Sequence, residues 1–262
     1  MQLTISIVTP TLNAGAFLSG CLEAIRYQDK NTVIAEHIIV DGGSTDDTVN
    51  LARKSGCTVI EGKDNGIFDA INKGNYLAKG DLIGFLGADD RLLPGAFSAL
   101  QAWYATRRAD WVTAPVLWTG SSGESLGTIR PPPSALPVTM YAALGWSCIA
   151  HMSTYVTPGF FRAVGGFDVS FRVAGDYDFF ARALQKERPD VLRTALATFA
   201  RHGANASMVD PLLRREIAVI ASRYASASRF RRETDRLLLK LWLNLANPDW
   251  ARMKALGRIH GK

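Results

Sequence analysis

The sequence lacks the features that mark disulfide-bonded, metal-clustering or membrane-spanning chains. Its three cysteines, Cys21, Cys57 and Cys148, are odd in number, far apart and form no C-x-x-C pair. They predict reduced, mostly buried thiols of a cytosolic protein and no cysteine metal site. The chain also lacks a run of about 18 apolar residues, and residues 1–9 show no basic stretch ahead of an apolar one. Neither a membrane span nor a secretory signal is therefore expected.

Glycine-rich phosphate-binding signatures are missing as well. The stretch TPTLNAGA after the first predicted strand does not contain the G-x-G-x-x-G that nicotinamide-dependent oxidoreductases use to approach pyrophosphate. The chain has no P-loop, and it has no glycine-rich, basic N-terminal signature of the kind found in sugar nucleotidyltransferases. The nicotinamide-dependent oxidoreductases, the P-loop proteins and the sugar nucleotidyltransferases are therefore disfavoured.

Composition predicts a folded globular chain with an uneven charge distribution. Hydrophobic residues make up 47% of the 262 residues and charged residues 21%, which suits one or two domains with a real core. Residues 212–262 hold 12 Lys and Arg against 4 acids, so this segment carries +8. The whole chain carries +6, which leaves −2 for the first 211 residues. The segment and the body are therefore expected to have different partners.

The first half alternates strand and helix patterns, which predicts an α/β fold with a mixed, mostly parallel sheet flanked by helices. Ser44 or Thr45 is expected to cap the helix that follows the second strand. The expected strands are LTISIVT, AEHIIVDGG, CTVIEG and DLIGFLG, and the expected helices are 15–28, the capped segment through 52, 67–79 and 95–106.

The second half is less regular. Gly, Ser and Pro dominate residues 120–137, which predicts a surface loop and a candidate lid. A short strand near 147–157, a helix at 177–186 and a strand at 190–200 are expected next. Asp210 and Pro211 open a predicted helix through Tyr224, and a second amphipathic helix spans about 229–246.

Acidic residues follow several of these predicted strands. Asp41 ends the second strand, Asp89 and Asp90 follow the fourth, and Asp176 opens a later helix. Any one of them could be an ordinary turn or cap residue. Together they are expected at one edge, because parallel sheets bind ligands beyond the carboxyl ends of their strands. The adjacent Asp89 and Asp90 repel each other, which favours a divalent cation, although either could instead cap the helix near Pro94.

Four runs of the sequence form a recognisable series, namely SIVTPTLNAGAFLSGCLEAI, IIVDGGSTDDT, GKDNGIFDAINKGNYLAKGDLIGFLGADD and VGGFDVSFRVAGDYDFFAR. They resemble the successive motifs of the family 2 glycosyltransferases, which have the GT-A fold, and the similarity covers about residues 4–205 in order and spacing. Within it, DNGIFDAINKGNYLAKGD resembles bacterial members acting in cell-envelope and exopolysaccharide synthesis.

The resemblance implies a binding site for a nucleoside diphosphate sugar. Asp41 could accept a hydrogen bond from the imide N–H of uracil, which favours a UDP-sugar. Turn chemistry is the alternative for Pro10 and Asn13, and a solvated helix lysine is the alternative for Lys73. The implied donor-binding residues are Pro10, Thr11, Asn13 and Asp41 at the nucleobase, Lys73 near the diphosphate, and Asp89 at the ribose or the metal.

The resemblance also implies a metal site and a catalytic base. Asp90, the last acid of the DxD-type motif, is expected to bind Mn²⁺ or Mg²⁺, with Asp89 contacting ribose or sharing the ion. Asp176 occupies the position of the base, and Gly175 replaces a glutamate that is frequent there. Asp178 is expected to be structural and to pair with Arg182, four residues on.

These implications combine into one predicted function. The chain is expected to be an inverting, metal-dependent glycosyltransferase that moves a sugar to a hydroxyl of a glycan or lipid-linked acceptor in envelope polysaccharide synthesis. A GT-A catalytic domain is predicted over 1–210, with a nucleotide-binding half at about 1–118 and an acceptor half at about 138–210, followed by a basic helical extension over 211–262. The alternative is a non-catalytic nucleotide-sugar-binding or membrane scaffold protein.

The basic extension and the histidines leave alternatives open. The extension could pack its apolar faces on the body, or lie on an anionic membrane as interfacial helices, which would place the protein in the cytoplasm and at the inner face of the membrane. Nucleic acid binding ranks last, because no recognition motif accompanies the charge. His151 and His202 are expected to be structural, with the diphosphate or the metal as an alternative partner of His202.

Overall fold

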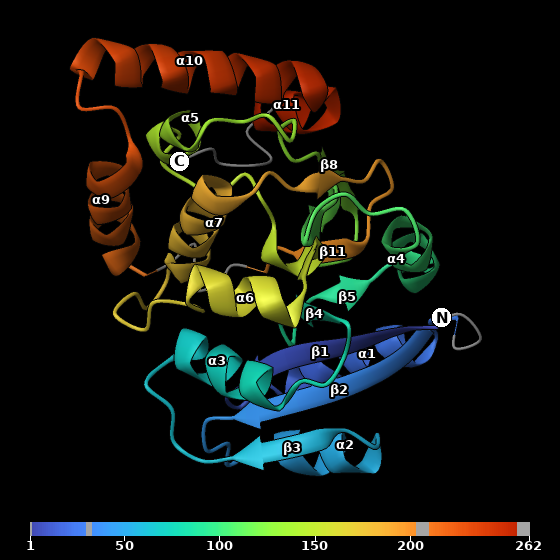
Figure 1. Cartoon of the computed structure of the whole chain (residues 1–262). Coiled ribbons are helices and arrows are strands. Elements are labelled where there is room, and N and C mark those ends of the chain that lie inside the picture. Colours follow the sequence, from blue (N-terminus) through green and yellow to red (C-terminus); the bar gives the residue numbers. More distant parts are fainter. Residues whose placement is uncertain (1, 30–32, 203–209, 256–262) are drawn as a thin grey trace.

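The computed structural model describes residues 2–29, 33–202 and 210–255, and it has mixed α/β architecture (Figure 1). The strands are β1 (Leu3–Thr11), β2 (Val33–Asp41), β3 (Thr58–Glu61), β4 (Leu82–Phe85), β5 (Arg91–Leu92), β6 (Trp111–Thr113), β7 (Val116–Thr119), β8 (Ser125–Ile129), β9 (Thr154–Val156), β10 (Asp190–Val191) and β11 (Ala197–Ala200). The helices are α1 (Gly15–Arg26), α2 (Thr48–Lys54), α3 (Ile67–Leu77), α4 (Ala96–Tyr104), α5 (Val138–Ala143), α6 (Pro158–Val164), α7 (Gly175–Lys186), α9 (Leu212–Tyr224), α10 (Arg229–Ala246), α11 (Pro248–Ala255) and the 3₁₀ turn η1 (His151–Ser153).

A seven-stranded sheet in the order β10-β6-β9-β4-β1-β2-β3 forms the centre of the fold. β1 pairs in parallel with both β2 and β4, and β2 pairs in parallel with β3. β9 runs antiparallel to its neighbours β4 and β6. The predicted fold class, a mixed and mostly parallel sheet with helices, is confirmed.

Both faces of β1 are buried, as expected for a strand in the middle of a parallel sheet. Leu3, Ile5 and Ile7 belong to one apolar cluster together with Leu18 and the rest of the inner face of α1. Val8 belongs to a second cluster, which includes α3, α6 and α7. Because helices cover both faces, the polar ends of the strands are left as the place where a ligand could bind.

A smaller sheet in the order β5-β11-β7-β8 contains the main departures from the sequence predictions. Residues 120–137 were predicted as a loop, but they contain β8, which pairs antiparallel with β7. Leu126 and Ile129 are buried there, and Gly127, at φ +116°, accommodates the irregular pairing near Trp118. This burial stabilises a strand in a segment whose Gly, Ser and Pro content predicts a loop.

Two further predictions need correction. The single strand expected at 190–200 is two strands, because β10 joins the large sheet beside β6 and β11 joins the small one. Neither Ser44 nor Thr45 caps α2, which begins at Thr48. The hydroxyl of Ser44 instead donates to Asp41, and Asp46 accepts the N–H of Thr48 at 3.1 Å.

The C-terminal helices lie on the body at the side opposite β3 (Figure 1). α9 packs against α5 and α7, α10 packs against α5, and α11 packs against β8. Ile220, Leu239 and Leu243 are buried in this contact. None of the helices in the described part of the chain has the length and apolarity required to cross a bilayer.

Candidate functional site

The carboxyl ends of β1, β2 and β4 meet at one edge of the large sheet. Thr11 and Asp41, the last residues of β1 and β2, are register partners, and the chain continues from β4 to Asp89 and Asp90. Because β9 runs antiparallel to β4, the residues that precede β9 reach the same edge, and these include His151. The topology therefore brings together residues from four separate parts of the sequence.

Asp41 is buried, and both of its carboxylate oxygens accept hydrogen bonds from neighbouring residues. Its Oδ1 accepts from the hydroxyls of Thr11 at 2.9 Å and Ser44 at 2.5 Å, and its Oδ2 accepts the N–H groups of Gly43 and Ser44. Burial opposes the charge, but these bonds outweigh it and lower the pKa of Asp41. Asp41 therefore fixes the loop after β2, and contact with a nucleobase stays a prediction.

Asn13 joins the loop after β1 to the loop after β2. Its N–H donates to Ser44 Oγ at 2.7 Å, and its Oδ1 accepts the N–H of Thr45 at 2.9 Å. Its φ of +50° lies in the left-handed region, which Asn tolerates better than most side chains. This pairing shapes the surface beside Pro10 and Thr11, where the nucleobase is predicted to bind.

Asp90 is a buried acid at the sheet edge whose charge is only partly compensated. Gly87 donates its N–H to Asp90 Oδ2 at 3.3 Å, whereas Oδ1 is buried and has no hydrogen-bond partner among the described residues. Burial, opposed by His151 and assisted by Asp89, raises the pKa of Asp90 to about 7. A Cβ at Gly87 would lie 2.8 Å from oxygens of both acids, so glycine permits this turn.

His151 lies between Asp90 and Asp176. Its Nε2 is 3.8 Å from Asp90 Oδ2, and its Nδ1 is 3.8 Å from Asp176 Oδ2. Burial opposes a charge on the imidazole, but the two carboxylates together raise the pKa of His151 above its ordinary value. The predicted metal ligand and the predicted base are thus bridged by one side chain.

His202 contacts the other acid of the pair. Its Nε2 is 2.8 Å from Asp89 Oδ2, and its ring stacks on Phe17 of α1 at a centroid distance of 4.9 Å. The structural role expected for His202 is consistent with this contact, and contact with the diphosphate or the metal stays a prediction. The imidazole helps to position Asp89 at the sheet edge.

Asp176 lies in the first turn of α7, where the helix dipole favours a negative charge. Its side chain is 25% exposed, so a solvent-borne hydroxyl can approach it. The preceding Gly175 is explained by packing, because a Cβ there would lie 2.6 Å from the ring of Phe68. A glutamate at position 175 would clash in this fold.

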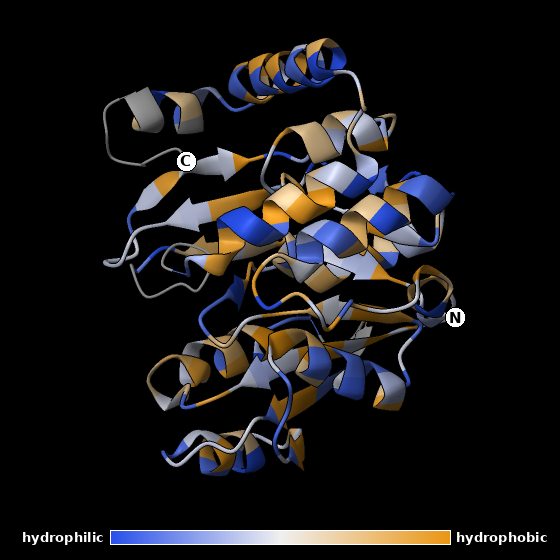
Figure 2. Cartoon of the chain, turned by 90° about the vertical axis from the view of Figure 1, so that its left-hand side faces the viewer, coloured by the Kyte–Doolittle hydropathy of each residue, from blue (hydrophilic) through white to orange (hydrophobic). Residues whose placement is uncertain are grey.

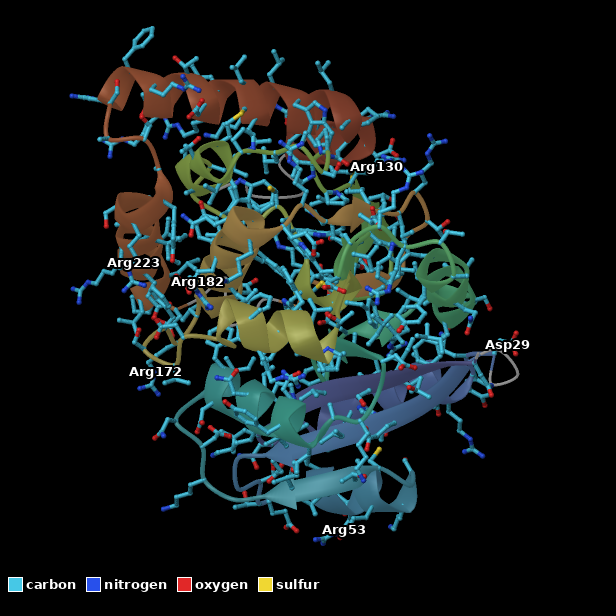
Figure 3. All side chains as sticks on the ribbon, in the orientation of Figure 1. Asp29, Arg53, Arg130, Arg172, Arg182 and Arg223 are labelled. Atoms are coloured by element: carbon cyan, nitrogen blue, oxygen red, sulfur yellow. The ribbon has the colours of Figure 1, made fainter. Side chains whose placement is uncertain are left out.

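Asp178, two residues further on, is buried in a network of bonds. Arg182 donates to it at 2.7 Å, as predicted, and Tyr224 and Arg223 of α9 approach at 3.2 and 3.5 Å. Figure 3 shows Arg182 and Arg223 on neighbouring helices. The network attaches α9 to α7 and gives Asp178 a structural role.

Lys73 forms an ion pair and a hydrogen bond with residues close to it in the sequence. Its ammonium lies 3.0 Å from Asp69, one helical turn earlier, and 3.1 Å from the carbonyl oxygen of Lys63. Its side chain is 41% exposed. A role at a diphosphate would require Lys73 to leave these partners, and it stays a prediction.

The residues at the edge fit a divalent cation that is only partly held by protein. Within residues 2–29, 33–202 and 210–255, no three His, Cys, Asp or Glu side chains gather to enclose an ion. Mg²⁺ and similar hard cations, however, are commonly held by one or two carboxylates, with phosphate and water completing the shell. The unpartnered Oδ1 of Asp90, beside Asp89, is the type of ligand such an ion needs.

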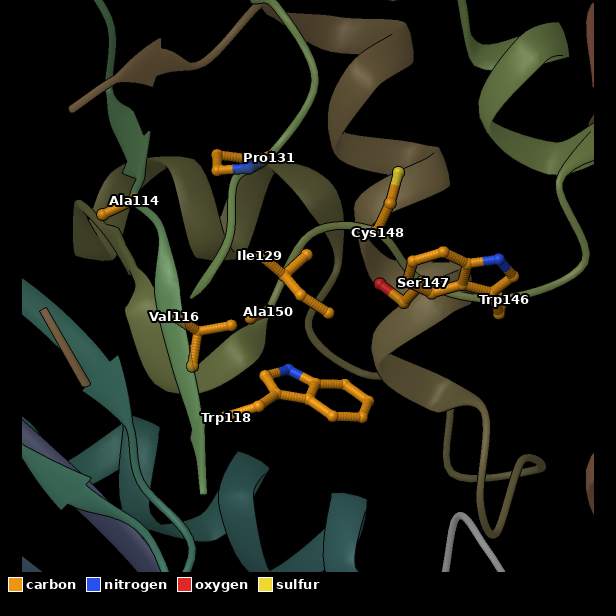
Figure 4. Close-up of a pocket in the computed structure, with 9 residues that line it drawn as sticks. All are labelled: Ala114, Val116, Trp118, Ile129, Pro131, Trp146, Ser147, Cys148 and Ala150. Carbon is orange, nitrogen blue, oxygen red and sulfur yellow. The ribbon is translucent and has the colours of Figure 1, made fainter. Parts of the chain in front are cut away.

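A cavity of about 40 Å³ near this edge is too small to be the main binding site (Figure 4). Two tryptophans, Trp118 and Trp146, line it together with Ala150, the neighbour of His151. Pockets for small molecules usually measure about 300–1,000 Å³. The cavity is therefore a packing gap beside the site.

The part of the site that sequence reasoning missed is His151. A single histidine in an irregular stretch gives no spacing signal. Only the antiparallel direction of β9 places it between Asp90 and Asp176.

Comparison with known proteins gives consistent matches. The model of the family described as "Glycosyl transferase family 2" matches residues 6–139. A "PGL/p-HBAD biosynthesis glycosyltransferase" of Mycobacterium tuberculosis is 31% identical over 182 residues, which cover 66% of this chain and 67% of that protein. An uncharacterised glycosyltransferase of the same species is 31% identical over 208 residues, covering 76% of each chain.

Solved structures resemble the fold at low sequence identity. Staphylococcus aureus TarS in complex with UDP-GlcNAc has a TM-score of 0.66 and 19% identity, covering 90% of this chain and 70% of that one. The mannosyltransferase PcManGT of Pyrobaculum calidifontis, in complex with GDP-Man and Mn²⁺, has a TM-score of 0.63 and 18% identity, covering 100% and 77%. At these identities the likeness concerns the fold.

Proposed function

This chain belongs to glycosyl transferase family 2 and has the GT-A fold, and on that basis we propose that it transfers a sugar from a nucleoside diphosphate sugar, with inversion at the anomeric carbon. The observation that carries the proposal is the buried, unpartnered Oδ1 of Asp90, at an edge that it shares with Asp89, His151 and Asp176. An uncompensated carboxylate repels an anionic leaving group. Its presence at such a site is explained when a cation accompanies the ligand and lies between the two negative charges.

The donor is proposed to be a UDP-sugar, bound along the ends of β1 and β2. Pro10, Thr11 and Asn13 form the surface beside the base, and the loop that Asp41 fixes offers backbone groups to it. The neighbour TarS is in complex with UDP-GlcNAc and PcManGT with GDP-Man, which supports a nucleotide donor without selecting the base.

Asp90 and Asp89 are proposed to hold Mn²⁺ or Mg²⁺ when the donor binds. The ion would supply positive charge to the diphosphate leaving group. His202 keeps the carboxylate of Asp89 at the edge through its 2.8 Å contact.

Asp176 is proposed to be the general base. In an inverting displacement the acceptor hydroxyl loses its proton as its oxygen attacks the anomeric carbon, and a carboxylate within about 3 Å can accept that proton. Asp176 on α7 is 25% exposed, and only the imidazole of His151 separates it from Asp90, which supports a base close to the proposed metal ligand. Asp178, enclosed by arginines and a tyrosine, cannot do this.

The acceptor is proposed to be a glycan or lipid-linked hydroxyl used in envelope polysaccharide synthesis. We assign catalysis to residues 1–210 and the positioning of the enzyme at the cytoplasmic face of a membrane to the basic extension, 211–262. The charge of +8 on residues 212–262 supports this division.

A thermal-shift screen of nucleoside diphosphate sugars with Mn²⁺ tests the proposal. A ligand at about 100-fold its Kd adds roughly 2.7 kcal/mol of stability, which raises the midpoint by several degrees. We expect a UDP-sugar to stabilise the protein in the presence of Mn²⁺ and to lose this effect in EDTA. If no nucleoside diphosphate sugar shifts the midpoint, the proposal fails. Binding without transfer or donor hydrolysis would favour a non-catalytic binding protein.

A further inference from the structure

α10 has large apolar residues on the side that faces away from the molecule. The exposed fractions are 83% for Phe230, 62% for Leu237, 53% for Leu238, 57% for Leu241 and 73% for Leu245. We call these five residues the outer stripe. At 100° per residue, they fall within one sector of the helix that is opposite the buried Leu239 and Leu243. Figure 1 shows α10 at the margin of the molecule, and Figure 2 shows hydrophobic and hydrophilic residues mixed along it.

The outer stripe is not required for packing α10 on the body. The inner side of the helix already contributes Leu239 and Leu243 to the core and packs against α5. A surface helix normally buries its apolar face and turns charged residues outward. A second apolar face on the solvent side is costly for a monomer in water and indicates that something else covers it.

Basic side chains border the outer stripe. Arg229 and Lys240 lie along one flank and Arg231 along the other, all of them exposed, and Arg231 also pairs with the buried Asp235 at 3.3 Å. On the side toward the body, Arg229, Arg232 and Arg236 line a groove of about 270 Å³ between α10, α9 and α5. Glu233 is the acid among them, and it is paired with Arg236.

We propose that the outer stripe of α10 is a membrane-docking surface that inserts into an anionic lipid bilayer, with the flanking cations at the level of the lipid phosphates. This names the surface for the membrane association proposed above and rests on that part of the proposed function. A helix with apolar residues on one side and Lys or Arg on its flanks is the type that lies in the plane of a membrane interface. The charge of +8 on residues 212–262 is complementary to anionic lipid and opposite in sign to the −2 of the rest of the chain.

A second copy of the chain fits this surface less well. Stable dimers bury about 800 Å² on each partner, from roughly 20–30 residues a side, whereas the outer stripe consists of five residues on one helix. Two copies joined through α10 would also bring the two sets of flanking cations together, and like charges repel. A bilayer needs only a narrow convex ridge, and its phosphates offset these cations.

Vesicle co-sedimentation tests the proposal with Leu237→Gln/Leu241→Gln in the full chain. Both leucines are more than half exposed, so the fold should survive, and circular dichroism checks this. Tyr76→Gln/Leu77→Gln, which removes exposed apolar groups from α3, is the matched control. Arg229→Gln/Lys240→Gln, at two exposed positions on one flank of the outer stripe, tests the charge. The vesicles are of phosphatidylcholine alone, or of phosphatidylcholine and phosphatidylglycerol in equal parts, each at low and high salt.

The wild type should bind the anionic vesicles, more weakly at high salt and little or not at all to phosphatidylcholine alone. The leucine variant and the charge variant should each bind the anionic vesicles at least roughly tenfold more weakly than the wild type. The α3 control should bind like the wild type. Anionic binding by the leucine variant equal to that of the wild type would overturn the proposal. So would a wild-type dimer in solution that the leucine substitutions convert to a monomer.

Donor binding separates this proposal from the proposed enzymatic function. The leucine variant should keep the wild-type response to a UDP-sugar with Mn²⁺, since α10 contributes no residue to the sheet edge. Vesicle binding that fails while the donor binds refutes the docking surface alone. Donor binding that fails in the wild type refutes the enzymatic function and leaves the vesicle result to be judged independently.

Discussion

Four of the aspartates singled out from the sequence differ in what satisfies their charge. Asp41 accepts four bonds from its own chain, and Asp178 is enclosed by Arg182, Arg223 and Tyr224. Asp90 keeps a buried oxygen that has no hydrogen-bond partner in the described part of the chain, and Asp176 is partly open to solvent. This difference divides structural acids from acids that can serve a ligand.

Replacing Asp176 by Asn should impair transfer without impairing donor binding. The amide keeps the shape of the side chain but cannot accept a proton, so transfer should fall by roughly 10²–10⁴-fold. The affinity for the UDP-sugar, measured by calorimetry, and the thermal midpoint should stay near wild type.

Asp178→Asn is the matched control. It leaves Arg182, whose side chain is 21% exposed, and the more exposed Arg223 facing a neutral amide in place of the buried carboxylate, so it should lower the free energy of unfolding by about 1–3 kcal/mol, measured by urea denaturation. The assignment of the base is wrong if the folded fraction of Asp178→Asn is inactive while Asp176→Asn transfers sugar at the wild-type rate.

His37, between β1 and β3, should make the fold sensitive to mild acid. Burial lowers its pKa from 6.5 to about 4, and Thr9 and Cys57 contact its ring. Between about pH 4 and pH 6.5 the unfolded chain binds a proton at His37 that the folded chain does not. Stability is therefore complete above about pH 6.5 and declines as the pH falls toward 4.

The variant His37→Gln cannot titrate and should lose less stability over that window. The expected difference from wild type is on the order of 1–3 kcal/mol, from urea unfolding at a series of pH values. Parallel pH profiles for the two proteins would show that His37 does not titrate as its burial implies.

The sequence predicts that Asp41, Asp89 and Asp90 lie at one edge because they end or follow predicted strands, and parallel topology brings such ends together. Asp176, in the first turn of α7, is singled out by its position at a predicted helix start and by the family resemblance.

Sequence reasoning could not identify the roles of His151 and His202. Their contacts depend on the direction of β9 and on the stacking of His202 on Phe17, and no local pattern encodes either. The prediction that Asp178 pairs with Arg182 succeeded because it depends only on helical spacing.

At the level of elements, a side chain of α9 fixes the segment that leads into α7. The carboxylate of Glu216 accepts the N–H groups of Arg172, Val173 and Ala174 at 2.7, 2.9 and 2.8 Å. These three residues lead directly into the turn that presents Asp176. The first helix of the extension therefore positions the predicted base.

Glu216→Gln should reduce transfer by loosening this turn. An amide presents one acceptor oxygen to three donors, so charge-assisted bonds are lost and stability should fall by about 1–3 kcal/mol. We expect a lower kcat with a nearly unchanged KM for the donor. Glu233→Gln, an exposed change on α10, is the control and should leave kcat as in wild type. Equal kcat values in all three proteins would remove the positioning role of Glu216.

The helices α1 to α4, α7, α9 and α10 and the strands β1 to β4 could be predicted because their apolar periodicity is local. The short helices α5 and α6 and the strands β8, β10 and β11 could not. β8 lies in a segment rich in Gly, Ser and Pro, and β10 and β11 form only because separate sheets offer edges at those positions. Tertiary contacts outweighed local composition there.

For the whole molecule, the extension is integral to the packing. A chain ending at Asp210 would expose the surfaces of α5 and α7 against which Ile220, Leu239 and Leu243 pack. We expect it to aggregate or to melt many degrees below the full chain in differential scanning calorimetry. A soluble truncated protein with the wild-type midpoint would show that the extension only rests on the body.

The central claim is that the edge formed by β1, β2 and β4 binds a nucleoside diphosphate through a divalent ion held by Asp90. Isothermal titration of UDP and GDP into the wild type and into Asp90→Asn, with Mn²⁺ and with EDTA, tests it most directly. We expect saturable one-to-one binding of UDP to the wild type with Mn²⁺, weakened by roughly 10²-fold or more in EDTA and in Asp90→Asn, because the charge of the diphosphate is then uncompensated. Equal UDP affinity in all of these conditions, or no binding of either nucleotide to the wild type with Mn²⁺, would contradict it.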